Sequence, residues 1–182
     1  IYFTSQNDDS IGETITGSSG SPAAGDWDGV LLYQHPGTFD YCNIYYGGKA
    51  SGGVNANIQF YFSGASGNQF TNCVSEYSAQ HGVRIQQTGI AFTGNTINNN
   101  TLNGLLHSES TTSYGVTFSN NVFNNNGDYA AQISAGFLQG FSNNSGTGNG
   151  VNGFSFQGTL DATSLTLSGY DSNFPLLYLS ID

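Results

Sequence analysis

The chain has 182 residues, of which 8% are charged and 37% hydrophobic, and its formal net charge is −10 with only two basic residues, Lys49 and Arg84. This composition excludes a disordered polyelectrolyte, and no run of residues approaches the ~18 apolar residues of a membrane-spanning helix. Nucleic acid is excluded as a partner because neutralising phosphates requires clustered Lys and Arg. The length suits one domain, and we expect the whole chain, 1–182, to form it.

The first segment, 1–28, differs from the rest of the chain. Its opening run, IYFTS, predicts a strand, and a long loop of small residues, GETITGSSGSPAAGDWDG, follows after a turn. The loop is rich in side-chain oxygens, which suit a hard cation such as calcium and equally suit a solvated acidic turn. Its composition favours the turn. The calcium interpretation uses the acidic residues Asp8, Asp9, Glu13, Asp26 and Asp28.

The middle of the chain, 29–160, repeats one phrase. A Gly-apolar-x-apolar run is followed by a Phe, and Asn or Cys lies three residues after that Phe. Successive copies start 22 to 28 residues apart, which is typical of a solenoid. The clearest copies open at Gly29, Gly82 and Gly104, and weaker ones at Asn57, Ala130 and Gly153.

Within each copy, apolar residues alternate with polar ones over short runs rich in Val, Ile, Phe and Thr, and no helical stripe is present. This pattern predicts an all-β fold, a right-handed parallel β-helix of about seven coils stacked ~4.8 Å apart. We expect two inward apolar ladders and one stack of aromatic rings. The ladders begin Val30, Ile58, Val83 and Leu32, Phe60, Ile85, with His107 in the second, and the stack is Phe39, Phe70, Phe92, Phe118 and Phe141.

A third predicted ladder is polar. Asn95, Asn121 and Asn144 should stack at a turn, where Asn tolerates left-handed backbone and amides hydrogen-bond along the axis. Cys42 and Cys73 fall in the same ladder, one coil apart. Parallel side chains make poor disulfide geometry, so the pattern favours two buried free thiols over a disulfide, and over a metal site still more.

Both ends of the chain have strand character. Because the end coils of a β-helix expose unpaired strand edges, the ends predict either end-to-end stacking on other copies or contact with neighbouring domains of a longer chain. The final segment, 161–182, should supply terminal strands. The residues assigned to these assembly ends are Ile1, Tyr2, Phe3, Leu177, Tyr178 and Leu179.

The outward positions of the coils offer one candidate binding face. Arg84 should point outward, and the side chains two residues further along each coil are Tyr33, Tyr61 and Gln86. Tyrosine rings stack on sugar rings, so these four residues form a candidate carbohydrate site. The histidines His35, His81 and His107 are widely separated and are interpreted as structural or surface residues.

An enzymatic alternative is a polysaccharide lyase or a glycoside hydrolase. A lyase needs a base, together with a cation that neutralises the substrate carboxylate, and Arg84 has no second basic residue beside it. A hydrolase needs two carboxylates that face the same bond. Asp40, Glu76 and Glu109 are expected in different coils and turns. The sequence therefore favours a non-enzyme, and we assign no catalytic residue and, apart from calcium, no cofactor.

Three stretches carry a family resemblance: IYFTSQNDDSIGETITGSSGSPAAGDWDGVLL, TFDYCNIYYGG and NGFSFQGTLDATSLTLSGYDSNFPLLYLSID. They resemble bacterial secreted or surface proteins with right-handed parallel β-helix repeats, in the pectate-lyase-like solenoid superfamily. Members often carry an acidic Asp-x-Asn-x-Asp-Gly-like stretch in the first loop, which GETITGSSG replaces here. The resemblance implies an extracellular or cell-surface solenoid with a structural or adhesive role. Carbohydrate binding or degradation is the alternative.

Overall fold

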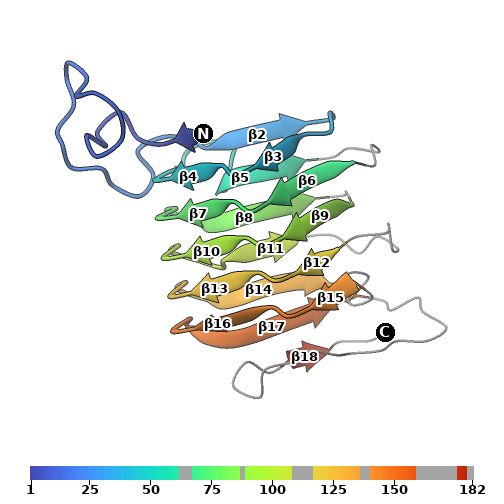
Figure 1. Cartoon of the computed structure of the whole chain (residues 1–182). Coiled ribbons are helices and arrows are strands. Elements are labelled where there is room, and N and C mark those ends of the chain that lie inside the picture. Colours follow the sequence, from blue (N-terminus) through green and yellow to red (C-terminus); the bar gives the residue numbers. More distant parts are fainter. Residues whose placement is uncertain (62–66, 87–88, 108–116, 136–139, 159–175, 180–182) are drawn as a thin grey trace.

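The regular elements described in the computed structural model are strands, and they wind into a right-handed parallel β-helix (Figure 1). The structure describes residues 1–61, 67–86, 89–107, 117–135 and 140–158, together with the backbone of 176–179. Three parallel sheets run along the axis, and each coil contributes one strand to each sheet in turn. The predicted fold class is confirmed.

The sheets contain seven, six and five strands within the described residues. Five coils therefore contribute to all three sheets, slightly fewer than the number expected. The seven-stranded sheet comprises β2 (Val30–Tyr33), β5 (Ala56–Tyr61), β8 (His81–Gln86), β11 (Leu105–His107), β14 (Tyr129–Ser134), β17 (Val151–Gln157) and β18 (Leu176–Leu179). The six-stranded sheet comprises β1 (Tyr2–Phe3), β4 (Asn43–Tyr45), β7 (Val74–Glu76), β10 (Thr96–Asn98), β13 (Val122–Asn124) and β16 (Ser145–Thr147). The five-stranded sheet comprises β3 (Thr38–Asp40), β6 (Asn68–Thr71), β9 (Ile90–Thr93), β12 (Phe118–Ser119) and β15 (Phe141–Ser142).

The apolar ladders lie inside the rod as predicted. Val30, Ile58 and Val83 are in register on adjacent strands, and Leu32, Phe60 and Ile85 form the neighbouring row. His107 is in register with Ile85, and its Nδ1 accepts a hydrogen bond from the backbone N–H of Ser134 at 3.3 Å. Burial lowers the pKa of His107 to about 4, so a neutral imidazole occupies this position in the core at neutral pH.

The predicted aromatic stack also forms. The rings of Phe70, Phe92, Phe118 and Phe141 are stacked, with successive centroids 5.5, 5.1 and 5.2 Å apart. All four side chains are buried. Phe39 continues the series in the first coil with a tilted contact to Phe70 at 6.4 Å.

The predicted asparagine ladder is confirmed, but the prediction of left-handed backbone at its residues was wrong. Asn95, Asn121 and Asn144 are buried, and each amide donates to the side-chain oxygen of the next. Left-handed backbone occurs one residue earlier, because that residue makes the turn and the ladder residue already points inward. These left-handed residues are Tyr41, Asn72, Gly94, Asn120 and Asn143.

The two cysteines occupy the first coils of the same ladder as free, buried thiols. The backbone N–H of Cys73 donates to Asn95 Oδ1 at 2.9 Å, and the N–H of Cys42 points at Cys73 Sγ at 3.4 Å. Burial raises the pKa of Cys73 to about 11, so the thiol stays protonated at neutral pH. The cysteines therefore act as small core residues, as predicted.

A second asparagine ladder was not predicted. Asn100, Asn126 and Asn149 follow the strands of the six-stranded sheet, and each amide donates to the oxygen of the next at 2.9 Å. All three are buried. The rod therefore has polar, hydrogen-bonded ladders at two of its corners and apolar side chains between them.

Candidate functional site

Three of the predicted binding residues line up across the outer face of the seven-stranded sheet. Tyr33 on β2 is in register with Tyr61 on β5, and Tyr61 is in register with Gln86 on β8. The two tyrosine rings are nearly parallel, 8° apart, with centroids separated by 5.5 Å. They are 54% and 38% exposed, so solvent reaches this stacked pair, which we call the aromatic platform.

Arg84, the fourth predicted residue, lies on the same face, two residues before Gln86. It is in register with Gln59 on β5 and Leu106 on β11. Gln59 Nε2 donates to Gln86 Oε1 at 2.6 Å, so the two amides hold each other in place beside the tyrosines. The structure thus brings together all four residues of the predicted carbohydrate site.

The guanidinium of Arg84 is incompletely satisfied. Its Nε is buried and has no hydrogen-bond partner in the described part of the chain. Burial lowers the pKa of Arg84, while the nearby Tyr61 opposes the shift. His81, at the start of β8, is partly buried beside it, and burial together with the Arg84 charge lowers the pKa of His81 to about 4. At neutral pH this face therefore presents one cation, one neutral imidazole, amides and tyrosine rings.

This combination suits recognition of a sugar. Tyrosine rings make apolar contacts with a pyranose ring through the surfaces that their own stacking leaves open, while amide and guanidinium N–H groups donate to hydroxyl or carboxylate oxygens. Asp40 and Glu76, two of the acidic residues weighed for hydrolysis, lie in different sheets, and Asp40 accepts hydrogen bonds from Thr71 and Asn72 at 2.9 Å. Glu109 lies outside the described residues.

The acidic residues of the first loop do not gather into one ligand set. Asp26 Oδ2 accepts hydrogen bonds from Ser5, Asn7 and the backbone of Ala23, and the Ser5 bond is the main cause of its lowered pKa. Asp8 accepts hydrogen bonds from Thr4 and Ser10, which lower its pKa against the opposing effect of burial.

Among the described residues, no group of three or more His, Cys, Asp or Glu side chains is placed to hold a metal ion. Asp9 accepts a hydrogen bond from Ser18, and Glu13 is exposed. N–H and O–H donors thus approach the carboxylates where a cation would have to lie. Calcium binding by Asp8, Asp9, Glu13, Asp26 and Asp28 remains a prediction without an assembled site.

The structure describes the side chains at the first of the two predicted assembly ends, but only the backbone at the second. Ile1 and Tyr2 are 77% and 53% exposed, and Phe3 contacts Phe39 with ring centroids 6.1 Å apart. The strand predicted at the other end is present as β18, whose backbone pairs with β17. The side chains of Leu177, Tyr178 and Leu179 lie outside the described part.

A second group of tyrosines, not predicted from the sequence, lies at a corner of the rod. Tyr46 and Tyr77 follow β4 and β7, and their rings are stacked with centroids 5.1 Å apart. The available signal was spacing: each comes directly after a three-residue strand of the six-stranded sheet, at equivalent positions of successive coils.

The fold and the residues described above define a parallel β-solenoid. The outer face of its seven-stranded sheet carries tyrosine rings and amide side chains. The chain belongs to the right-handed β-helix family, because the model described as "Right handed beta helix region" matches residues 1–168. No curated protein and no solved structure matches the chain. No helix among the described residues has the length and apolar character needed to cross a membrane.

Proposed function

We propose that this chain is a non-catalytic, extracellular or cell-surface β-solenoid with an adhesive role, and that it binds carbohydrate through Tyr33, Tyr61, Arg84 and Gln86. The observation that supports this proposal is the exposed, parallel tyrosine pair in register with Gln86. Exposed aromatic rings next to fixed amides bind a sugar with little loss of side-chain entropy. The resemblance to secreted and surface solenoids supports the location.

Replacing Tyr33 or Tyr61 with alanine should weaken glycan binding at least about tenfold, or about 1.4 kcal/mol, because each change removes a stacking ring. Isothermal titration against galactomannan, laminarin, alginate and pectate measures the effect. Tyr41→Ala is the control, because Tyr41 is 70% exposed but follows β3 in a different sheet.

Wild-type affinity in both platform variants, or no binding of any glycan by the wild-type protein, would refute the proposed site. The same panel tests the enzymatic alternative, because a lyase releases unsaturated products that absorb in the ultraviolet. Such products from pectate or alginate would contradict the non-catalytic proposal.

A second candidate function, end-to-end assembly into filaments, is favoured by the first coil. Val30, Leu32 and Phe39 are only partly buried, whereas their neighbours one coil further along, Ile58, Phe60 and Phe70, are at most 1% exposed. Among the described strands, β2 and β3 are also the last members of their sheets. A second copy stacked on this coil would bury these side chains and pair the strand edges.

Assembly predicts a concentration-dependent increase in mass that Leu32→Lys abolishes, because an inward-pointing charge on an edge strand prevents stacking. Leu31→Lys is the matched control, since Leu31 lies on the opposite face of β2 and is 45% exposed. Light scattering and electron microscopy report the result. A wild-type protein that stays monomeric at every concentration would contradict assembly.

A further inference from the structure

Four tyrosines gather where the first loop joins the six-stranded sheet. Tyr46 and Tyr77 are stacked, 11° from parallel, and Tyr45 contacts both rings edge-on with centroids 6.2 and 6.5 Å away. Tyr2 extends the group through a 6.3 Å contact with Tyr45. We call Tyr2, Tyr45, Tyr46 and Tyr77 the tyrosine cluster. Tyr2 and Tyr77 are 53% and 39% exposed, so solvent reaches the cluster.

Two residues of the cluster adopt a backbone conformation that is unfavourable for tyrosine. Tyr46 and Tyr77 have φ angles of 62° and 59°, in the left-handed region that is unfavourable for an L-residue with a large side chain. In later coils the corresponding left-handed residues are Asn99, Asn125 and Gly148, which tolerate this conformation better. Large aromatic side chains thus occupy turn positions where the same rod elsewhere uses Asn or Gly. Strain of this kind is found at functional sites.

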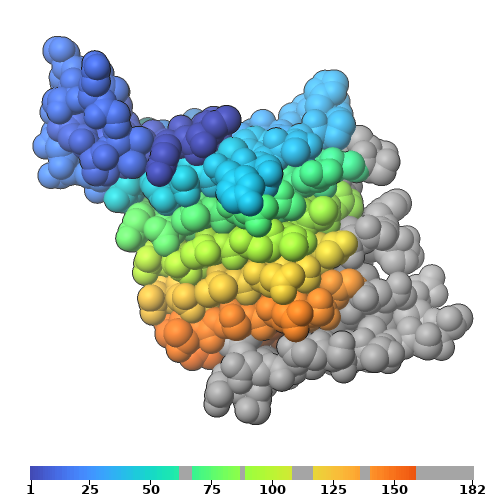
Figure 2. All heavy atoms as spheres, viewed as in Figure 1, coloured from blue at the N-terminus to red at the C-terminus, as the bar shows by residue number. Residues whose placement is uncertain are grey.

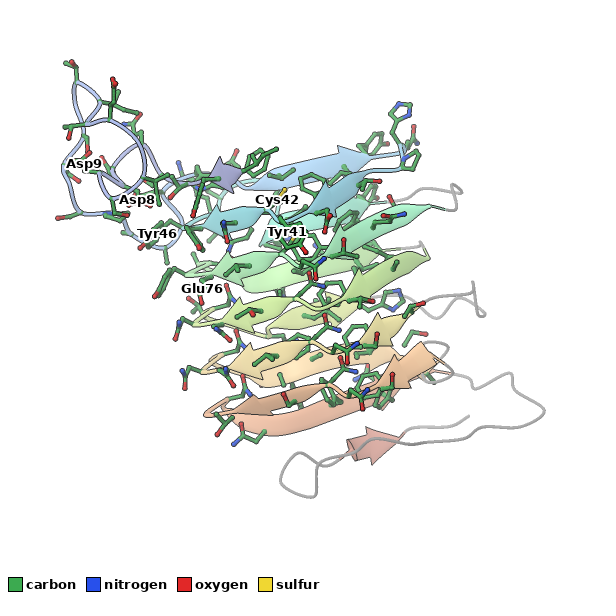
Figure 3. The ribbon with its side chains drawn as sticks, viewed as in Figure 1. Asp8, Asp9, Tyr41, Cys42, Tyr46 and Glu76 are labelled. Atoms are coloured by element: carbon green, nitrogen blue, oxygen red, sulfur yellow. The ribbon has the colours of Figure 1, made fainter. Side chains whose placement is uncertain are left out.

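Two carboxylates, Glu76 and Asp8, lie near the rings. Glu76 on β7 is in register with Tyr45, and Asn98 Nδ2 donates to its Oε1 at 3.0 Å. Figure 3 shows Asp8, Tyr46 and Glu76 on the side of the rod where the first loop joins the coils. Burial, and then the nearby Glu76 carboxylate, raise the pKa of Tyr45 to about 12, so its phenol stays neutral at neutral pH.

The chain has only two basic side chains, Lys49 and Arg84. Arg84 lies on β8 of the seven-stranded sheet, whereas the backbone N–H of Lys49 donates to the backbone oxygen of Trp27, close to the cluster. Ring faces attract cations through their quadrupoles, and a neighbouring carboxylate adds a direct attraction. The corner therefore combines the two features that recognise an ammonium or guanidinium group.

We propose that the tyrosine cluster and Glu76 form a binding site for a lysine or arginine side chain of a partner protein. The formal net charge of −10 supports this choice of partner, because it attracts basic surfaces and repels acidic ones. The site belongs to a different sheet from Tyr33 and Tyr61, so it is independent of the carbohydrate face. The first loop, which projects from the coils in Figure 2, borders the site.

The single tryptophan provides a fluorescence reporter for this site. Trp27 Nε1 donates to the backbone oxygen of Tyr45 at 2.7 Å, so its environment changes when a ligand contacts the cluster. A short peptide with arginines separated by glycines should change Trp27 emission saturably. The same peptide with glutamine in place of arginine should not.

Tyr77→Asn and Glu76→Gln should each weaken binding of the arginine peptide about tenfold or more. Asn preserves the left-handed turn, as at Asn99, and Gln keeps an oxygen that can accept the hydrogen bond from Asn98. Circular dichroism checks that both variants remain folded.

Tyr41→Asn is the control for the tyrosine change, because Tyr41 is also left-handed but lies at the other corner, where Asn72 follows in the next coil. It should bind the arginine peptide like the wild-type protein. Equal binding of the glutamine peptide, or equal loss in Tyr41→Asn and Tyr77→Asn, would overturn the proposal and indicate general attraction to an acidic protein.

Discussion

Replacing Asn121 with alanine should lower the free energy of unfolding by about 2–6 kcal/mol, because each of two buried polar groups left without a partner costs about 1–3 kcal/mol. Asn121 is fully buried, and its amide donates to Phe92 O at 3.0 Å and to Asn144 Oδ1 at 2.8 Å. Its oxygen accepts from the backbone N–H of Asn95 at 3.0 Å. Alanine leaves the Asn95 N–H and the Phe92 carbonyl buried without these partners.

Urea unfolding measures this loss as a lower midpoint with an unchanged slope. Asn124→Ala is the matched control, because Asn124 is only partly buried and its side-chain oxygen accepts from the backbone N–H of Thr147 at 3.0 Å. Water replaces that partner, so the control should cost less than about 1 kcal/mol. Equal losses in the two variants would show that buried amide ladders do not hold the coils together.

Phe92→Ala should cost about 3–5 kcal/mol, because it opens a cavity in the middle of the aromatic stack. Phe92 is fully buried between Phe70 and Phe118, and its ring also faces Phe123 at 6.5 Å. Neighbours on both sides prevent the site from collapsing. The same urea experiment measures the change.

Phe39→Ala, in the first coil of the same stack, should cost less than Phe92→Ala. Phe39 is only partly buried, so its removal uncovers a surface that water already reaches. A loss below about 1 kcal/mol for Phe92→Ala would contradict its central position, and equal losses would show that the stack is not packed more tightly inside the rod.

The repeat in the sequence was sufficient to predict the architecture. Side chains alternate along a strand, and the phrase that recurs every 22 to 28 residues identifies the equivalent residues that lie above one another. The sequence alone therefore pairs Val30 with Ile58, Phe92 with Phe118, and Asn95 with Asn121. The outward residues Tyr33, Tyr61 and Gln86 followed by the same rule.

Side chains in turns follow no such alternation, so the sequence was insufficient to predict the conformation of the turns. Whether Tyr46 or its neighbour turns outward depends on which residue adopts left-handed backbone, and stacking of whole coils selects that residue. The sequence favours Asn or Gly there, so it did not predict Tyr41, Tyr46 and Tyr77 in this conformation.

Residues distant in the chain met only through the tertiary structure. Register between coils brings Glu76 beside Tyr45, and the path of the first loop brings Asp8 near Tyr46. By itself the sequence determined the rod, its inner ladders and the composition of one outer face, because these depend on period alone. The tertiary structure decided the second asparagine ladder, the tyrosine cluster, and the hydrogen bonds that tie each loop carboxylate to different donors. These features depend on turn conformation and on contacts between coils.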